Sequence, residues 1–288
     1  GMGLFRELVA SKGVSVDIPK ENEAVGEMMM NGSDAVSLGA LAGGCDFMPS
    51  YPMSPATGVL TYLARHARSH AVAVEQAEDE IAAINMALGA SYGGARSMVS
   101  TSGGGLSLMG EGVSLAGITE LPVVLHIGQR PGPATGMATR TEQGDVNLAV
   151  YCGHGDVPRA VFAPGSLERA FRLTFDAFNL ADEFQVPVFI LTDQYFLNSF
   201  YNVPEFETSG LKVQRFLVES GEDYRRYEVT ESGVSPRSVP GFGRGIVGTD
   251  SHEHDEVGHV QEDFELRRRM VDKRLRKRKG ILERVIEP

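Results

Sequence analysis

A short hydroxyl side chain, Ser54, lies between two prolines in the segment SYPMSPATG. Pro52 and Pro55 each fix the backbone φ angle at about −65° and lack a backbone donor, so the segment is predicted to form a stiff bend. The Ser54 hydroxyl could cap the helix that the following residues, ATGVLTYLARHARSH, predict. It could instead bind a ligand that approaches the bend, and the local sequence leaves both interpretations open.

Four acidic side chains fall within six positions in the segment EQAEDE, at a predicted junction between a strand and a helix. The positive end of a helix dipole favours carboxylates there by roughly a few tenths of a kcal/mol, which explains most of them. Glu80 differs because it leads a face of small apolar residues at helical spacing, Ala83, Ala87 and Ala90. Glu80 is therefore a candidate for acid–base chemistry, although acids that only cap helices are far more common.

Three consecutive glycines, from Gly103 to Gly105, separate a predicted strand from a predicted helix. Glycine lets a backbone approach a ligand closely, and phosphate is the usual ligand of such a turn. The segment has neither the GxGxxG spacing nor the P-loop lysine, so a dinucleotide or nucleoside triphosphate site is not supported.

The loop after the apolar run LPVVLHIG contains two arginines and several hydroxyl side chains. The guanidinium of Arg130 is a planar fork that suits a carboxylate, and Thr135 could donate to the same anion. Alternatively, Arg130 pairs with Glu142 or Asp145 and only shapes the loop. The sequence leaves both roles open.

Metal-ligand residue types are concentrated in SHEHDEVGH, which contains His252, His254 and His259. Such a cluster could hold a metal ion. HxH spacing is also common in polar loops without metal, so we expect no metal site on this chain. Cys45 and Cys152 show no CxxC spacing, which argues against a structural zinc, an iron–sulfur cluster or a disulfide framework.

The elements that must position these residues repeat the order helix, short apolar run and glycine-rich bend from about residue 33 to residue 199. The predicted strands are residues 45–51, 70–75, 96–102, 121–128, 159–166 and 186–193. The predicted helices are residues 34–44, 58–67, 79–92, 105–116 and 167–184. This alternation predicts an α/β fold with a doubly wound, mainly parallel six-stranded sheet. Because ligands bind at the carboxyl ends of such strands, we expect the candidate residues at one edge of the sheet.

Polar, turn-rich sequence replaces this alternation after residue 203 and leads to a predicted basic helix over about residues 260–278. We expect three parts, namely an N-terminal segment (1–22), an α/β domain (23–203) and an irregular extension (204–288). Residues 267–279 hold nine Lys or Arg and one Asp, so the rest of the chain carries −11 − 8 = −19. Such a segment could bind nucleic acid, but a solvated helix docked on an acidic surface is more common, and we expect no nucleic-acid partner.

No run of about 18 apolar residues and no charged-then-apolar N-terminal signal occurs. We therefore expect neither a membrane span nor secretion, and a cytoplasmic protein. Gly1 resembles the remnant of a tag rather than a part of the fold. The chain stops at VIEP without a helix cap, which suggests a fragment of a longer polypeptide.

Five motifs follow one another along the chain: YPMSPAT, EDEIAAINMALGASYGGARSM, TSGGGLSLMGEG, TELPVVLHIGQRPGPATGMATRTEQGD and GHGD. Together they closely resemble the α subunit of the 2-oxoacid:ferredoxin oxidoreductases, and SGVSPRSVPG and EHDEVG extend the similarity over nearly the whole chain. The resemblance implies the pyrimidine domain of a thiamine diphosphate-binding fold. It also implies a partner β subunit that carries the diphosphate, its Mg²⁺ and an iron–sulfur cluster, without which this chain is inactive.

The activity that the resemblance implies is the oxidative decarboxylation of a 2-oxoacid to an acyl-CoA. Coenzyme A is then the co-substrate, ferredoxin accepts the electrons, and the full complex is expected to self-associate. Overall similarity slightly favours 2-oxoglutarate, with pyruvate and branched-chain 2-oxoacids left open. The alternative is a non-catalytic α/β binding or assembly module with a basic partner-docking tail, and the joint presence of Glu80, Ser54 and Arg130 favours the enzyme.

The resemblance also implies roles for single residues. Ser54 stands where the family motif has threonine and is expected to face the substrate and the cofactor. Glu80 resembles the glutamate that activates the cofactor, with Glu78, two residues earlier, as the alternative. Arg130 and Thr135 match positions expected to bind the substrate carboxylate. The expected cofactor-binding residues are Glu80, Pro52, Gly103 and Gly104.

Overall fold

The computed structural model describes residues 2–13 and 24–284 of the 288-residue chain. Its parallel strands are β2 (Phe47–Ser50), β3 (Ala73–Gln76), β4 (Met98–Thr101), β5 (Val123–Gln129), β6 (Ala160–Phe162) and β7 (Pro187–Asp193). Four of them are hydrogen-bonded in the order β4–β5–β7–β6, and β2 pairs with β3. A parallel bridge between Phe47 and Ser97 joins the two groups. The described residues thus confirm the predicted α/β fold with its six parallel strands.

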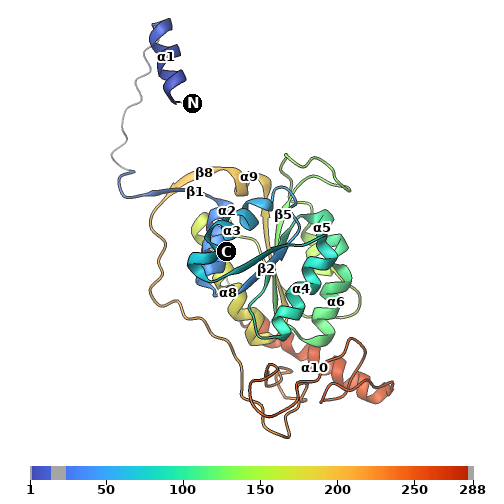
Figure 1. The fold of residues 1–288 in the computed structure, drawn as a ribbon. Helices are drawn as coiled ribbons and strands as arrows, with labels where there is room; N and C mark the ends of the chain where they lie inside the picture. Colours follow the sequence, from blue (N-terminus) through green and yellow to red (C-terminus); the bar gives the residue numbers. More distant parts are fainter. Residues whose placement is uncertain (1, 14–23, 285–288) are drawn as a thin grey trace.

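Helices cover both faces of this sheet (Figure 1). One face carries α2 (Gly32–Ala42), α3 (Thr57–His70) and α8 (Leu167–Phe184). The other carries α4 (Glu80–Tyr92), α5 (Gly103–Leu108) and α6 (Gly110–Thr119). The sheet is therefore doubly wound, and each face packs its own hydrophobic core.

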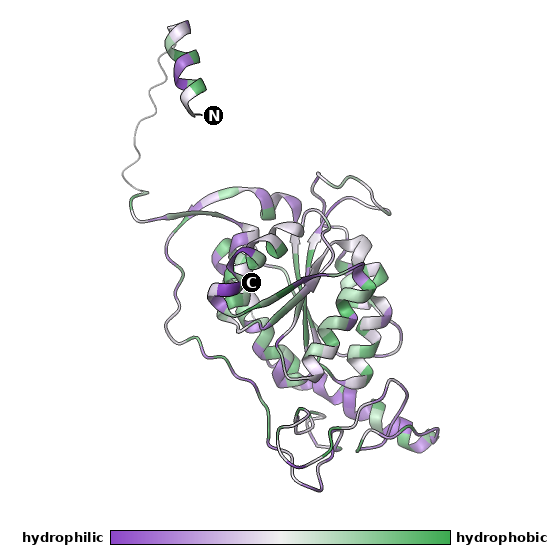
Figure 2. Ribbon diagram, viewed as in Figure 1, coloured by the Kyte–Doolittle hydropathy of each residue, from purple (hydrophilic) through white to green (hydrophobic). Residues whose placement is uncertain are grey.

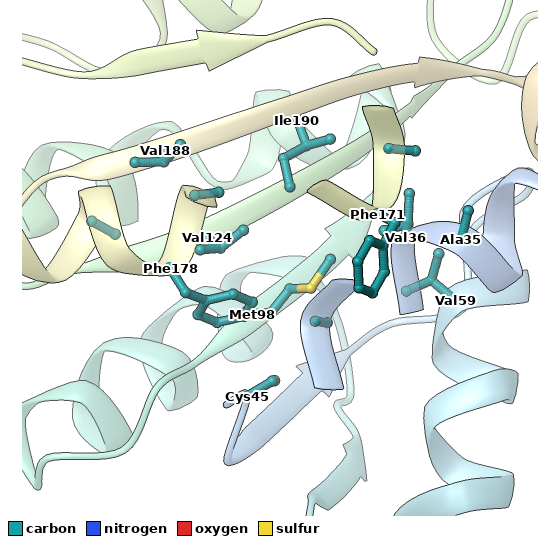
Figure 3. Packing of buried hydrophobic residues seen from close by; sticks show 14 of the residues in the cluster. Ala35, Val36, Cys45, Val59, Met98, Val124, Phe171, Phe178, Val188 and Ile190 are labelled. Carbon is teal, nitrogen blue, oxygen red and sulfur yellow. The ribbon is translucent and has the colours of Figure 1, made fainter. Parts of the chain in front are cut away.

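The central strands β5 and β7 separate the two cores. Every residue of both strands is buried, as expected for parallel strands with helices on both sides. Because successive side chains point to opposite faces, Val124 lies in the core beside α8 whereas Val123 and Leu125 lie in the core beside α4 and α6. Figure 3 shows Val124 with Ile190 and Phe178 in the first core, and Figure 2 shows these strands as the apolar interior.

Helix α8 has the predicted bounds because its start carries a clear capping signal. Ser166 accepts a hydrogen bond from Arg169 N at 3.2 Å. The helix predicted over residues 105–116 is instead two helices, α5 and α6, which meet at Met109. Gly110 follows this break, and glycine is a poor helix former.

The remaining elements of the described residues were not predicted, apart from the last helix. They are α1 (Met2–Lys12), α7 (Val146–Tyr151), α9 (Gln194–Asn198), and the strands β1 (Met28–Asn31) and β8 (Phe200–Val203), which form an antiparallel pair. The last helix, α10 (Phe264–Leu282), begins after its cap Asp263 rather than at about residue 260.

The irregular extension between β8 and α10 is attached near the amino ends of the strands. Asp182 of α8 accepts hydrogen bonds from Arg96, just before β4, at 2.7 Å and from Arg237 of the extension at 2.9 Å. Figure 1 shows the extension and α10 at this end of the molecule. The division of the chain at residues 203 and 204 stays a prediction.

The basic helix α10 packs one side on acidic residues, as expected for a solvated helix docked on an acidic surface, but its contacts are more deeply buried than such docking requires. Lys273 and Lys277 are at most 1% exposed, and each ammonium lies 2.5 Å from a carboxylate oxygen of Glu120. Arg274, also buried, pairs with Glu253 at 2.9 Å. Burial lowers the pKa of Lys277 to about 7, despite the nearby carboxylate. The tail therefore packs on buried carboxylates of its own chain.

The three histidines of the extension do not converge on one point. His252 Nδ1 lies 2.7 Å from Asp250 Oδ1, and the ring of His254 packs 4.0 Å from that of Tyr227. Within residues 2–13 and 24–284, no three His, Cys, Asp or Glu side chains are grouped so as to hold a metal ion. No helix in the same residues is long and apolar enough to cross a membrane. The cytoplasmic location stays a prediction.

Candidate active site

Four predicted site residues follow four neighbouring strands. Ser54 comes after β2, Glu80 after β3, Gly103 after β4 and Arg130 after β5. Since these strands are parallel, their carboxyl ends lie at one edge of the sheet. In Figure 1 this is the edge near the labels β5 and α5, at the opposite end from α10.

Ser54 and Arg130 are in direct contact across this edge. Arg130 Nη1 donates a hydrogen bond of 2.6 Å to the backbone carbonyl oxygen of Ser54. Helix α3 has Ala56 as its N-cap, without a side-chain capping bond. The interpretation of Ser54 as a helix cap is therefore wrong, and its side chain is exposed at the bend.

The loop-shaping ion pair suggested for Arg130 is also not formed. Neither Glu142 nor Asp145, both of which the structure describes, lies within 4.0 Å of the guanidinium as an ion pair. Arg130 is half-buried and fixed at one nitrogen by a backbone carbonyl. This arrangement orients the fork without neutralising its charge, which suits the binding of an external carboxylate.

Glu80 is the first residue of α4, but the capping is done by its neighbour. Asp79 Oδ1 accepts a hydrogen bond from Ala82 N at 2.7 Å. Glu80 itself is 3% exposed, and its Oε1 is buried without a hydrogen-bond partner. Glu78 is exposed. Because buried polar atoms almost always have partners, the unpaired Oε1 is an acceptor that remains open to a ligand.

The carboxyl groups of Glu80 and Asp145 lie close to the turn formed by Gly103 to Gly105. A Cβ on Gly105 would overlap Thr101 Oγ1 and lie 2.9 Å from Glu80 Oε1, and a Cβ on Gly103 would overlap the carboxylate of Asp145. Gly104 between them is exposed. Neighbouring side chains of the same chain leave no room for a Cβ at positions 103 and 105, which explains the glycines there. Gly104 is the glycine of this turn whose backbone a ligand could approach.

Asp145 also lies at this edge, although its sequence position suggests only a partner for Arg130. Its Oδ2 is buried without a hydrogen-bond partner, and its backbone N–H donates to Gln129 Oε1 at 3.0 Å. Burial and then Glu142 raise the pKa of Asp145, against the lowering effect of Arg130. The sequence signal at Asp145 is its position just before α7, which is typical of a helix cap. Its side chain makes no capping bond, so the carboxylate is left for another role.

Two predicted residues are less closely integrated. Thr135 is exposed in the loop after β5 and has no hydrogen-bond partner among the described residues. Pro52 is half-buried and precedes Met53, whose sulfur accepts a hydrogen bond from Ser102 at the glycine turn. The bend around Ser54 and the turn of Gly103 to Gly105 are therefore in contact, whereas no hydrogen bond among the described residues holds the Thr135 side chain near Arg130.

Comparison with known proteins gives consistent matches. Residues 38–273 match the family model described as "Pyruvate flavodoxin/ferredoxin oxidoreductase, thiamine diP-bdg". The chain is 39% identical over 264 residues to the α subunit of 2-oxoacid:ferredoxin oxidoreductase 1 from Sulfurisphaera tokodaii, covering 86% of this chain and 42% of the relative. It is 33% identical over 261 residues to subunit KorA of 2-oxoglutarate synthase from Methanothermobacter thermautotrophicus, covering 88% and 69%.

A solved structure shows the same fold. The 2-oxoglutarate:ferredoxin oxidoreductase from Magnetococcus marinus, with 2-oxoglutarate, coenzyme A and succinyl-CoA bound, matches with a TM-score of 0.87 and 37% identity. The match covers 94% of this chain and 47% of that chain. The present chain thus spans less than half the length of several proteins that it matches.

Proposed function

Because this chain belongs to the pyruvate flavodoxin/ferredoxin oxidoreductase family of thiamine diphosphate-binding domains, we propose that it is the α-subunit part of a 2-oxoacid:ferredoxin oxidoreductase. The proposed reaction is the oxidative decarboxylation of a 2-oxoacid to an acyl-CoA, with ferredoxin as electron acceptor. The observation that carries the proposal is the buried, unpaired Oε1 of Glu80 at the carboxyl edge of the sheet. The names of two relatives support 2-oxoglutarate as the preferred substrate, with pyruvate as the second candidate.

Glu80 fits a thiamine diphosphate site in its chemistry. Its unpaired carboxylate oxygen would accept a hydrogen bond from a protonated ring nitrogen of the aminopyrimidine and hold the proton there. When bound, thiamine diphosphate supplies the carbanion chemistry that the decarboxylation of 2-oxoacids needs. Gly104 and Pro52 would lie against the cofactor, where the exposed turn and the bend leave room.

Arg130 and Ser54 would bind the substrate. The Arg130 fork would hold the substrate carboxylate through charge-assisted hydrogen bonds, while the Ser54 carbonyl keeps the guanidinium in place. The exposed Ser54 hydroxyl would face the same substrate, and Thr135 would add a donor once its loop closes on the bound anion. These roles put recognition of the carboxylate on two neighbouring loops of this chain.

A partner subunit would complete the site. As the family resemblance implies, the proposed β subunit carries the diphosphate, Mg²⁺ and an iron–sulfur cluster. The two cysteines of this sequence, Cys45 and Cys152, are consistent with a cluster held elsewhere, because a typical cluster needs four thiolates. Coenzyme A would take the acyl group, and the full complex would self-associate. The names of the relatives as α subunits support a partner of this kind.

The alternative, an assembly module with a basic docking tail, loses part of its support, because three of the nine basic side chains of the tail are not available to a partner. The tail was to dock a partner, but Lys273, Arg274 and Lys277 are buried against Glu120 and Glu253 of the same chain.

The decisive experiment is to co-express the chain, with the rest of its polypeptide if it is longer, and its β subunit, and to assay the purified complex. With thiamine diphosphate, Mg²⁺ and coenzyme A present, we expect reduction of a dye that depends on a 2-oxoacid. 2-Oxoglutarate, pyruvate and a branched-chain 2-oxoacid are compared at equal concentrations. A saturated complex that reduces no dye with any of the three would refute the proposal.

A further inference from the structure

A chain of buried polar side chains crosses the centre of the sheet. His126 on β5 is fully buried, and its Nδ1 lies 2.8 Å from Ser100 Oγ on β4. On the other side, His126 Nε2 lies 2.8 Å from Thr192 Oγ1 on β7. Ser100 in turn lies 3.2 Å from the carbonyl oxygen of Ala56. The contacts connect β7, through β5 and β4, to the bend that carries Ser54.

These contacts have a preferred direction. Burial lowers the pKa of His126 to about 3, so the ring is neutral and carries one N–H. If that proton is on Nδ1, Thr192 donates to Nε2, His126 donates to Ser100, and Ser100 donates to the Ala56 carbonyl. The three bonds are then 2.8, 2.8 and 3.2 Å long. With the proton on Nε2, Ser100 cannot donate to both Nδ1 and Ala56, and Thr192 is left with a contact of 3.4 Å to the Ile127 carbonyl.

The end of this chain lies next to the proposed substrate site. Ala56 is two residues after Ser54, and the Ser54 carbonyl holds Arg130 Nη1 at 2.6 Å. Ser100 also holds the strand before the bend, because its backbone N–H donates to Ser50 Oγ at 2.9 Å. The bend is therefore fixed on both sides of Ser54 by one residue of β4.

We propose that Thr192, His126 and Ser100 act as one positioning relay, which holds the Ser54 bend and through it the guanidinium of Arg130 for the substrate carboxylate. The inference rests on the proposed function, because it assumes that Arg130 binds the 2-oxoacid. The three relay side chains are buried within the sheet, so their effect on the substrate would be through geometry. Thr192 is the informative member because it lies on β7, two strands away from Ser100.

The test compares two relay variants with a matched control in the assembled complex. Ser100→Ala removes the contact with Ala56, and Thr192→Val removes only the remote hydroxyl at nearly constant volume. Thr174→Val is the control, because Thr174 is equally buried, on α8, and its hydroxyl has no hydrogen-bond partner. The measurements are KM and kcat for the preferred 2-oxoacid, the melting temperature, and hydrogen exchange of peptides that cover residues 51–60.

We expect both relay variants to raise KM about fivefold, the factor that corresponds to one net hydrogen bond, with kcat within about twofold of wild type. Hydrogen exchange over residues 51–60 should become faster in both relay variants. Thr174→Val should change neither KM nor this exchange. If Thr192→Val lowers the melting temperature but leaves KM and exchange at the bend unchanged, the residue is only structural and the relay does not exist. An inactive wild-type complex would refute the proposed function instead, and the exchange comparison would still decide the relay.

Discussion

Asp79 and Glu80 are adjacent acids at the start of α4, yet the structure uses them differently. Asp79 caps the helix through its bond to Ala82 N at 2.7 Å. Glu80 is left with a buried carboxylate oxygen that has no partner. An unsatisfied buried acceptor costs about 1 to 3 kcal/mol, which a bound donor would offset. Of these two acids, Glu80 is therefore the one that we propose for cofactor binding.

Glu80→Gln tests this role. In the assembled complex we expect turnover to fall by about 10²-fold or more, because an amide cannot hold the proton that acid–base chemistry needs. The melting temperature should hardly change, since glutamine has nearly the same shape. Glu78→Gln, at an exposed position, is the matched control and should retain wild-type turnover. If the two variants behave the other way round, Glu78 is the cofactor-activating residue.

Arg130→Lys tests recognition of the substrate carboxylate. Lysine keeps the charge but lacks the planar fork, and the loss of a charge-assisted hydrogen bond costs roughly 1.5 to 3 kcal/mol. KM for the preferred 2-oxoacid should rise about ten- to a hundredfold, while the affinity for thiamine diphosphate stays the same. KM for 2-oxoglutarate and pyruvate is measured together with the melting temperature.

The exposed Arg140 in the same loop provides the control for this experiment. Arg140→Lys should leave both KM values unchanged. An unchanged KM in Arg130→Lys would remove Arg130 from the site. A loss of thermal stability that weakens substrate and cofactor alike would instead show that Arg130 only shapes the loop.

Buried ion pairs attach helix α10 to the rest of the fold. Glu120 ends α6 and receives Lys273 and Lys277 from one face of α10. Burial alone would raise the pKa of Glu120, but Lys277, Lys273 and Arg226 outweigh it and hold that pKa well below its usual range. The Glu120 carboxylate therefore stays ionised. Its single negative charge lies near the positive charges of Lys277, Lys273 and Arg226.

This imbalance predicts unequal effects of two substitutions. Glu120→Gln leaves two buried ammonium groups without their carboxylate and should destabilise the protein by about 3 to 5 kcal/mol. Lys277→Met removes a buried charge whose pKa is already lowered to about 7, and Glu120 keeps Lys273, so the change should stay within about 1 kcal/mol. Melting temperatures of the two variants test this prediction. Equal decreases in melting temperature for Glu120→Gln and Lys277→Met would contradict it.

The sheet itself should be sensitive to acid at His126. Its pKa is lowered to about 3 by burial, whereas an unfolded histidine titrates at about 6.5. Between these pH values the unfolded chain binds a proton that the folded chain does not, so this contribution to stability is complete above pH 6.5 and is lost as the pH falls toward 3. The loss should be about 1.4 kcal/mol per pH unit.

The measurement compares wild type with His126→Gln at several pH values from 7 to about 5. The variant starts with a lower melting temperature, because a buried hydrogen-bonding group has been replaced. The gap should narrow as the pH falls, since only the wild type loses the contribution of a neutral histidine. A gap that does not depend on pH would show that burial does not suppress protonation of this ring.

At the scale of the whole molecule, the two edges of the sheet differ. The extension and α10 pack near the amino ends of the strands, while the carboxyl edge presents exposed groups such as Ser54, Gly104 and Thr135. The described residues place the Glu80 carboxylate and the Arg130 guanidinium at this edge, the two groups that we propose for the aminopyrimidine and the substrate carboxylate. This arrangement supports the proposal that the cofactor site is divided between this chain and a partner subunit.

We therefore predict that the chain alone binds thiamine diphosphate weakly and has no activity. Calorimetry with the isolated chain should give a Kd well above ~1 μM, even with Mg²⁺ present, and the partner subunit should lower it. The folded state of the isolated chain is checked first by its thermal transition. A Kd of ~1 μM or below for the folded chain alone would show that it holds the diphosphate itself.

The amino-acid sequence was sufficient to predict the order of the parallel strands and their covering helices, and the edge at which the candidate residues lie. Apolar runs such as VVLHIG and capping signals such as Ser166 act locally, so they fix the type of each element and, for α8, its ends. The parallel order then requires that loops following the strands meet at the carboxyl edge. The break at Met109 was missed because a single glycine-rich helix and two short ones have the same composition.

Which side chains at that edge are left without partners depends on packing in three dimensions and could not be predicted. Glu78 and Glu80 are alike in sequence, and their burial differs because α4 packs against the sheet from its first turn. Asp145 reaches Gly103, and His126 reaches both Ser100 and Thr192, because β5 lies between β4 and β7. Such contacts join residues far apart in the chain, and they depend on strand order and register, which local patterns do not specify.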